Sequence, residues 1–151
     1  MALPRHCIVY DRLKIVLVGD VEVGKTWLLS RAQELFATFC DDGYSLFKKP
    51  FAPPEVYSPT VFESFLTNVD TENLGNYQTN IWDTGGWWIF NSDRPLSYVG
   101  AHVFMLCFDV TNRDSLYHVT ESWLPEVNKY QPGVPVLLVG TKGDLRAEKE
   151  R

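Results

Sequence analysis

The stretch LKIVLVGDVEVGKT, from Leu13 to Thr26, decides the fold of this chain. Its first part, Leu13–Gly19, is mostly aliphatic and β-branched and too short for a helix, which predicts a strand buried on both faces. From Lys25 to about Thr38 the apolar side chains follow helical spacing. A strand, a glycine-bearing loop and a helix in this order begin an α/β fold.

The loop between this strand and this helix, Gly19 to Thr26, fits the phosphate-binding pattern G-x-x-x-x-G-K-[ST] in the required context. Its backbone N–H groups can surround a polyphosphate, Lys25 adds positive charge at the β and γ oxygens, and the Thr26 hydroxyl can ligate Mg²⁺. The alternative is a strand–helix turn that holds these residues by coincidence. The pattern favours a purine nucleoside triphosphate site. Its candidate residues are Asp20, Val21, Glu22, Val23, Gly24, Lys25, Thr26 and Trp27.

The composition is that of one globular domain, with 151 residues, 45% apolar and 22% charged. A net charge of −5 argues against a nucleic-acid partner, because neutralising phosphates needs a basic face. No apolar run is long enough to span a bilayer, and Met1–Arg12 lacks the apolar core of a secretory signal. Cys7, Cys40 and Cys107 form neither a disulfide framework nor a CxxC pair, which indicates a reducing, cytoplasmic compartment.

Strands and helices continue to alternate after the loop. The segment Asp114–Tyr130 has helical spacing, with Asp114 or Ser115 as candidate N-cap and with Pro125 predicting a kink or break. The alternation predicts a mostly parallel sheet flanked by helices, with ligands at the carboxyl ends of the strands. The further predicted strands are Val61–Val69, Tyr77–Trp82, Ala101–Val110 and Val134–Gly140, the last two buried.

Four more motifs follow in order: YSPTVFE at 57–63, WDTGG at 82–86, RPLSY at 94–98 and VGTKGDLR at 139–146. With the phosphate loop, they resemble the effector, WDTAG, RPLSY and guanine motifs of the Rho family of small GTPases. The resemblance implies an α/β, Ras-like P-loop NTPase fold and GTP or GDP with Mg²⁺ as ligands. It also implies that residues 1–12 are an N-terminal extension and residues 13–151 the GTPase domain.

The resemblance gives a role to each matching residue near the phosphates. Thr60 resembles the switch threonine that joins Mg²⁺ and the γ-phosphate only in the triphosphate state. Asp83 resembles the carboxylate of the magnesium shell, and the Gly86 N–H resembles the donor to the γ-phosphate. Loss of that phosphate would release both loops. The implied metal ligands are Thr26, Thr60 and Asp83.

At the base, Asp144 resembles the carboxylate that accepts hydrogen bonds from guanine N1–H and N2–H₂. Adenine lacks this donor pair and would leave the carboxylate poorly paired. The stem of Lys142 is expected along the base, and the resemblance adds Tyr57 and Thr141 to the nucleotide site. Taken alone, 141–144 would be an ordinary polar turn after a strand. The implied effector-binding residues are Tyr57, Val61, Phe62 and Glu63.

Two residues depart from the family pattern where GTP is hydrolysed. Val21 stands where the family has glycine, and Trp87 stands where it has the glutamine that orients the attacking water. An indole has one donor and no acceptor, so Trp87 cannot bridge the water as an amide does. Val21 would also crowd an arginine finger, which is worth on the order of 10³–10⁵ in rate. We expect impaired hydrolysis; the alternative is neutral drift in a domain whose hydrolysis is supported by other groups.

Two further departures concern the base and the region before the effector motif. The family packs an aromatic residue against guanine at the position of Pro53, and Phe51 lies two residues earlier. If Phe51 does not substitute, nucleotide exchange should be fast. The chain also carries an insertion around 39–53, interpreted as a mobile surface loop or, alternatively, as a docking loop.

The last departure is at the C-terminal end. The chain stops at Arg151, before the last strand, the last helix and the prenylated tail of the family. We therefore expect an incomplete domain, no membrane anchor in this chain and a partly uncovered sheet.

The leading hypothesis is a cytoplasmic, Rho-like signalling module that is mostly GTP-loaded, hydrolyses GTP weakly and recruits effectors through its effector motif. Exchange factors and GAPs are further expected partners. The first alternative is an ordinary cycling GTPase. The second is a pseudo-GTPase that acts as an interaction module and binds nucleotide weakly. No catalytic residue is assigned, because Val21 and Trp87 occupy the positions where the family has glycine and glutamine.

Overall fold

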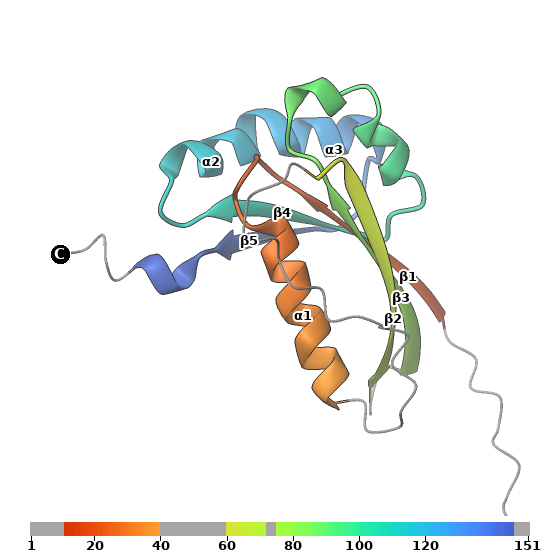
Figure 1. Cartoon of the computed structure of the whole chain (residues 1–151). Coiled ribbons are helices and arrows are strands. Elements are labelled where there is room, and N and C mark those ends of the chain that lie inside the picture. The colour runs from red at the N-terminus through yellow and green to blue at the C-terminus, as the bar shows by residue number, and fades with distance from the viewer. Residues whose placement is uncertain (1–10, 40–59, 72–74, 147–151) are drawn as a thin grey trace, which may run out of the picture.

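The computed structural model describes residues 11–39, 60–71 and 75–146. They form one five-stranded sheet in the order β2-β3-β1-β4-β5, with helices on both faces (Figure 1). No helix in these ranges is long and apolar enough to cross a bilayer. The main elements are β1 (Asp11–Val18), α1 (Lys25–Phe39), β2 (Phe62–Thr71), β3 (Gly75–Thr84), β4 (Val103–Asp109), α2 (Arg113–His118), α3 (Leu124–Tyr130) and β5 (Val136–Thr141).

The strand pairing confirms the mostly parallel sheet. The central strand β1 pairs in parallel with β3 and β4, and β4 pairs in parallel with β5, whereas β2 runs antiparallel to β3. Leu17 near the end of β1 lies opposite Asp83 of β3 and Met105 of β4, so three carboxyl ends meet at one edge. The P-loop (residues 19–26) leaves β1 at this edge, where α/β sheets bind their ligands.

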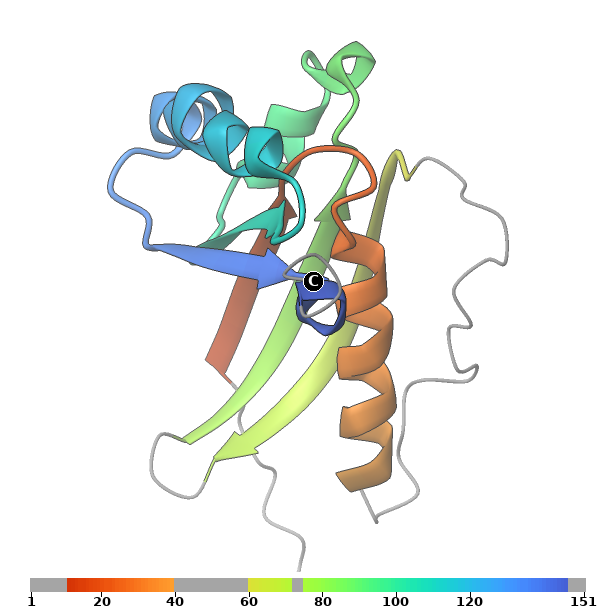
Figure 2. The ribbon, with the colours of Figure 1, turned by 90° about the vertical axis from the view of Figure 1, so that its left-hand side faces the viewer.

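Alternation along β1 divides the core into two layers. Val16 and Val18 are fully buried in a cluster that includes Trp123 from the α2–α3 layer. Leu17, between them, belongs to a second cluster that includes Leu29 of α1. Figure 2 shows α1 on one side of the sheet and α2 and α3 on the other. Because both faces of the second half of β1 are covered, residues 15–18 form a continuous apolar run.

The break predicted in 114–130 is confirmed and has the form of a π-helical turn. α2 ends at His118, Val119–Trp123 form the π turn, and α3 begins at Leu124. Pro125 has no N–H to donate to the helical ladder, and the wider turn before it accommodates the missing bond.

The N-cap of α2 differs from the prediction. Asn112, rather than Asp114 or Ser115, is the cap, and its side-chain oxygen accepts a hydrogen bond from Asp114 N at 3.0 Å. The Ser115 hydroxyl instead accepts from Asp109 N at 3.0 Å, which ties the helix to the end of β4. The helix begins at Arg113, earlier than expected, because an asparagine side chain caps as well as a carboxylate.

The prediction of a fully buried strand is wrong for β5. Leu137 and Leu138 are 55% and 58% exposed. The reason is that β5 pairs only with β4 in the described sheet and lies at its edge. The exposure of these two leucines shows that part of the described sheet is not covered by other elements, as we predicted. Cys107 in the neighbouring β4 is fully buried, as expected of a core residue.

Candidate functional site

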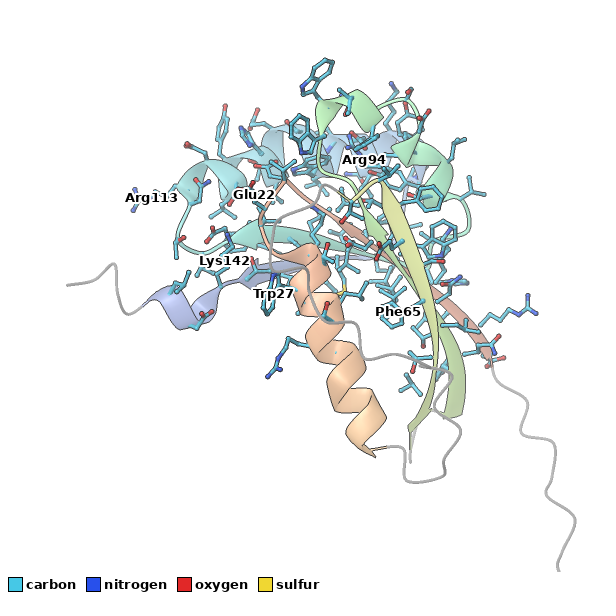
Figure 3. All side chains as sticks on the ribbon, in the orientation of Figure 1. Glu22, Trp27, Phe65, Arg94, Arg113 and Lys142 are labelled. Carbon is cyan, nitrogen blue, oxygen red and sulfur yellow. The ribbon has the colours of Figure 1, made fainter. Side chains whose placement is uncertain are left out.

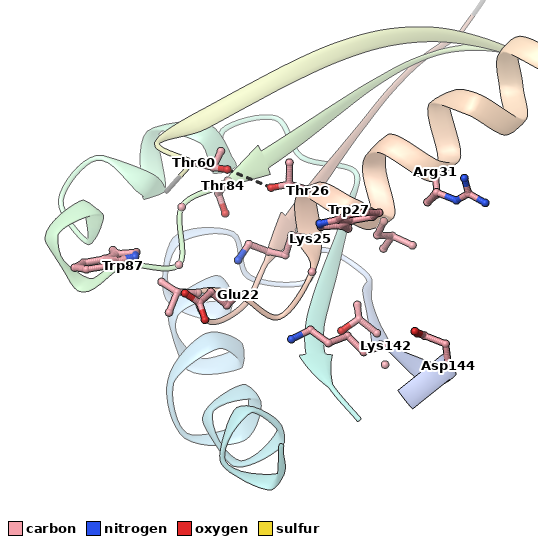
Figure 4. Close-up of a pocket in the computed structure, with 17 residues that line it drawn as sticks. Glu22, Lys25, Thr26, Trp27, Arg31, Thr60, Thr84, Trp87, Lys142 and Asp144 are labelled. Atoms are coloured by element: carbon pink, nitrogen blue, oxygen red, sulfur yellow. Dashed lines mark hydrogen bonds between the residues drawn. The ribbon is translucent and has the colours of Figure 1, made fainter. Parts of the chain in front are cut away.

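A cavity of about 860 Å³ opens at the carboxyl edge of the sheet, around the start of α1. Figure 4 shows that the P-loop, the start of α1, the segment after β3 and the end of β5 surround it. The predicted nucleotide-site residues that line it are Val21, Glu22, Gly24, Lys25, Thr26, Trp27, Thr60, Gly86, Thr141, Lys142 and Asp144.

The P-loop wraps around the amino group of Lys25. Lys25 Nζ donates to the main-chain oxygens of Gly19 at 2.8 Å and Asp20 at 2.7 Å. Gly19 has a φ of +153°, and a Cβ there would collide with the carbonyl oxygen of Cys107, so only glycine fits. Burial lowers the pKa of Lys25, while the carboxylate of Asp83 acts in the opposite direction. A cation held in this buried loop interacts strongly with an anion, because the local dielectric is low.

The segment after β3 packs directly on the P-loop. A Cβ added at Gly86 would lie 2.5 Å from main-chain atoms of Asp20 and Val21. Side chains do not tolerate such an approach, so glycine is required here. The main chain of Gly86 therefore borders the same part of the cavity as the P-loop.

Arg94, the first residue of the RPLSY motif, anchors this segment. Its Nη1 donates to the main-chain oxygens of Gly85 at 2.9 Å and Trp87 at 3.3 Å. Its Nε and Nη2 donate to the two carboxylate oxygens of Glu126, each at 2.9 Å, and only 2% of the Arg94 side chain is exposed. This bidentate pair fixes the guanidinium, which in turn holds one wall of the cavity.

The three predicted metal ligands meet at the start of α1. Thr26 Oγ1 donates to Asp83 Oδ2 at 2.5 Å and lies 3.1 Å from Thr60 Oγ1. Figure 4 marks the contact between the two threonines. The three side chains come from α1, from β3 and from a position two residues before β2, so their meeting depends on the tertiary structure.

The residues at this point suit a divalent cation. Asp83 is fully buried, and its Oδ1 has no hydrogen-bond partner among the described residues. Burial raises the pKa of Asp83, while the hydrogen bond from Thr26 and the charge of Lys25 act to lower it. A cation at Oδ1 would compensate this buried carboxylate. Hydroxyl and carboxylate oxygens suit Mg²⁺, and the described residues contain no cluster of three His, Cys, Asp or Glu side chains that would suit a softer metal.

Val21 and Trp87, the two departures from the family pattern, both line the cavity. Their exposed fractions are 38% and 39%. In Figure 4, Trp87 lies at one end of the cavity and Asp144 at the other. The cavity therefore has a hydrophobic end beside Gly86 and a polar end at β5.

At the polar end, Lys142 is held by Asp109. Lys142 has a left-handed φ of +56°, and its Nζ donates to Asp109 Oδ2 at 2.9 Å. Asp109 Oδ1 accepts from the N–H and the hydroxyl of Thr111, both at 2.7 Å. Burial acts to raise the pKa of Asp109, but the hydrogen bonds from Thr111 and Lys142 outweigh it and keep this pKa below its ordinary value of 3.8. An ionised Asp109 therefore fixes the course of the Lys142 stem.

Thr141 joins the end of β5 to the P-loop. Its hydroxyl lies within hydrogen-bonding reach of the main-chain oxygens of Val23 and Phe108, the latter at 2.8 Å. Asp144 follows on the 3₁₀ helix Gly143–Leu145, where it is exposed and lines the cavity. The short link to Thr141 keeps this carboxylate at the end of β5, on the wall of the cavity that the P-loop also lines.

Two predicted residues lie in the P-loop but direct their side chains elsewhere. The Asp20 carboxylate accepts from Trp123 Nε1 at 2.8 Å and lies 2.7 Å from His118 Nδ1. Val23 is buried in the core cluster beneath α1. We therefore expect these two residues to offer only their main chain to a ligand. Tyr57 lies outside the described residues.

The remaining predicted residues are exposed: Val61 directly before β2, and Phe62 and Glu63 at its start. β2 is an edge strand of the described sheet. The ring of Phe62 stacks on that of Trp82, with 5.9 Å between their centroids.

Five residues that line the cavity were not predicted: Leu28, Arg31, Thr84, Gly85 and Gly140. Arg31 lies four residues after Trp27, so helical spacing could have placed both on one face of α1. Thr84 and Gly85 belong to the WDTGG motif, from which only Asp83 and Gly86 were predicted as site residues. Gly140 likewise belongs to the VGTKGDLR motif, from which only Thr141, Lys142 and Asp144 were predicted to bind nucleotide.

Comparison with known proteins is consistent with this site. Residues 14–150 match the sequence profile of the Ras family, a range that includes every motif from the P-loop to VGTKGDLR. The chain is also similar to a curated "GTP-binding RHO-like protein" from Candida albicans (strain WO-1), with 40% identity over 137 residues. The alignment covers 90% of this chain and 35% of that protein, so the chain spans about a third of the length of the relative.

Proposed function

Because this chain belongs to the Ras family, as a Rho-like small GTPase with a guanine-nucleotide-binding domain, we propose that it is a signalling module that stays mostly GTP-loaded and hydrolyses GTP poorly. In this proposal residues 13–151 form the GTPase domain, and residues 1–12 are an extension preceding it. Its partners are effector proteins, exchange factors and GAPs, and its place of action is the cytoplasm.

The observation that carries the proposal is the pairing of Val21 and Trp87 on the wall of one cavity, next to Gly86. Hydrolysis needs a group that orients the attacking water beside the γ-phosphate. The isopropyl group of Val21 cannot hydrogen-bond to water, and the Trp87 indole can donate but cannot accept. Both residues weaken the attack of water on the γ-phosphate. Val21 occupies space beside the phosphate, and Trp87 lacks the hydrogen-bond acceptor that would orient the water.

Guanine recognition in this proposal rests on Asp144 and Lys142. The exposed carboxylate of Asp144 accepts from the N1–H and N2–H₂ edge of the base, and the Lys142 stem, held by Asp109, packs along it. An adenine base would leave the carboxylate without its donors.

At the phosphates, Lys25 and the P-loop main chain bind the β and γ groups in this proposal. Thr26, Thr60 and Asp83 would hold Mg²⁺, which when bound neutralises charge on the β and γ oxygens. Thr60 is the member of this set that responds to the triphosphate in this proposal, because it resembles the family's switch threonine and lies two residues before β2, in the segment that leads to the exposed effector motif.

The effector surface in this proposal is formed by Tyr57, Val61, Phe62 and Glu63. The exposed fractions of Val61 and Phe62, 55% and 59%, support it because large apolar side chains on an edge strand suit a protein partner. Val61 O accepts from Gly85 N at 2.9 Å, which links this surface to the segment beside the γ-phosphate position.

The test is single-turnover phosphate release from preloaded GTP, with and without a Rho-family GAP. We expect slow release that the GAP does not accelerate. The double variant Val21→Gly with Trp87→Gln should restore GAP stimulation more than either single variant, because both residues act on one transition state.

Other outcomes would replace this proposal. Fast, GAP-stimulated release by the unmodified protein would make it a cycling GTPase. A purified protein that neither contains nor binds guanine nucleotide would make it a pseudo-GTPase. The nucleotide that co-purifies, and its ratio of di- to triphosphate, gives an independent measure of the loaded state.

A further inference from the structure

We propose that the indole of Trp27 stacks on the guanine base and forms one wall of the base site, with the alkyl stem of Lys142 as the other. This inference rests on the proposed GTP binding and specifies how the base is held. It assigns a specific role to the side chain of a residue that the sequence only indicated as one of the nucleotide-site candidates.

The position of Trp27 supports this role. Trp27 lies in the first turn of α1, directly after Thr26, and lines the cavity (Figure 3). Its side chain is nevertheless 58% exposed, although an indole is among the largest apolar surfaces a protein can bury. A planar ligand that covered the ring would remove this surface from water, which favours binding. Arg31, four residues on, lines the cavity too, so the α1 wall continues beyond Trp27.

Lys142 forms the facing wall. In Figure 4, Trp27 projects from α1 on one side of the cavity, and Lys142 and Asp144 lie on the other. The stem of Lys142 passes close to the P-loop, with its Cε 4.0 Å from the point where a Cβ on Gly24 would lie. The bond from Lys142 Nζ to Asp109 keeps the stem there. A base between the two walls has its edge toward Asp144.

The sequence gives a reason for this arrangement. The aromatic residue that the Rho-family resemblance predicts against guanine is replaced by Pro53. Stacking of a base on an aromatic side chain strengthens nucleotide binding by about ten- to a hundredfold, as alanine substitutions show. Trp27 supplies such a ring from a helix, which is a more rigid support than a loop.

The test compares two ligands and three variants. Affinities for GTP and for inorganic tripolyphosphate are measured by calorimetry on the unmodified protein and on Trp27→Ala, Trp27→Phe and Trp88→Ala. Trp88 is a matched control, because its indole is 74% exposed and does not line the cavity. We expect Trp27→Ala to weaken GTP binding by about ten- to a hundredfold and to leave tripolyphosphate binding unchanged. Trp27→Phe should retain most of the affinity, and Trp88→Ala should behave as the unmodified protein.

Indole fluorescence gives a second measurement. A guanine stacked on an indole quenches its emission, so GTP should quench the unmodified protein and Trp88→Phe but not Trp27→Phe. Tripolyphosphate should quench none of them.

Two results would overturn the inference alone. One is GTP affinity of Trp27→Ala equal to that of the unmodified protein. The other is an equal loss of GTP and tripolyphosphate affinity, which would mean that Trp27 supports the P-loop rather than the base. An unmodified protein that binds tripolyphosphate but not GTP, or neither ligand, would refute the proposed function, and the inference with it.

Discussion

The indole Nε1 of Trp123 donates a 2.8 Å hydrogen bond to Oδ1 of Asp20, across 103 positions of the sequence. The other carboxylate oxygen lies 2.7 Å from His118 Nδ1. One side chain of the P-loop is thus held by the helical layer on the far face of the sheet. Trp123 is in turn 6% exposed and has the guanidinium of Arg94 4.6 Å from its ring centroid. The same indole therefore contacts both Asp20 of the P-loop and Arg94, which holds the segment after β3.

The first prediction concerns this bond. In a double-mutant cycle with Trp123→Phe and Asp20→Ala, urea unfolding should give a coupling free energy of about 1 kcal/mol, because a partly buried hydrogen bond to a carboxylate is lost in either variant. A parallel cycle with Trp88→Phe and Asp20→Ala should give a coupling close to zero, since Trp88 is exposed. Equal coupling in both cycles would show that the bond adds nothing to stability.

The second prediction concerns pH and Asp109. Because its pKa in the folded protein is below 3.8, Asp109 stabilises the fold at pH values above 3.8, and this contribution is lost as the pH falls through the folded-state pKa. The free energy of unfolding should therefore fall less between about pH 5 and pH 3 in Asp109→Asn than in the unmodified protein. Asp109→Asn should also weaken GTP binding at neutral pH, because Lys142 is no longer held.

Asp11→Asn serves as the control for this experiment, since Asp11 is an exposed carboxylate at the start of β1. It should leave GTP affinity unchanged. If Asp109→Asn and the unmodified protein have the same unfolding profile over this pH range, the bond to Lys142 does not stabilise the folded state.

The third prediction concerns base selection. Asp144→Asn should weaken GTP binding by at least about tenfold and improve binding of xanthosine triphosphate, because the amide can donate to the C2 carbonyl of xanthine. Competition against a fluorescent GTP analogue measures both. Asp114→Asn, an exposed substitution outside the cavity, should change neither affinity. ATP competing as well as GTP in the unmodified protein would contradict the assignment of Asp144.

The fourth prediction concerns the metal. Thr26→Asn removes the hydroxyl that bonds to Asp83 and would help to hold Mg²⁺. It should weaken GTP binding more than GDP binding, because the additional phosphate of GTP carries charge that the cation would neutralise. The difference should be present with Mg²⁺ and lost in EDTA. Thr120→Asn is a suitable control, because Thr120 is exposed and its hydroxyl donates to the main chain of Tyr117. Unchanged Mg²⁺ dependence in Thr26→Asn would remove Thr26 from the metal site.

Local sequence determined the part of the fold that surrounds the P-loop. The aliphatic run before Gly19 specifies a buried strand, and the apolar spacing after Lys25 specifies a helix, because each pattern suits only one backbone period. The loop between them must then lie at the carboxyl end of the central strand. The predicted bounds of α1, Lys25 to about Thr38, differ from the observed end at Phe39 by one residue. The break before Pro125 could also be predicted from the local sequence, because the missing N–H of a proline disrupts hydrogen bonds within one helical turn.

The tertiary structure alone decided which side chains meet across the cavity. Asp109 and Lys142 are 33 positions apart, and Asp20 and Trp123 are 103 apart, so no local periodicity links either pair. Each pair depends on how the strands are ordered and in what register they pair. The exposure of Leu137 and Leu138 has the same origin, since an apolar run is buried on both faces only when the sheet and its helices extend over it. Backbone period is a property of a few consecutive residues, whereas contact between distant segments is a property of the whole packed sheet.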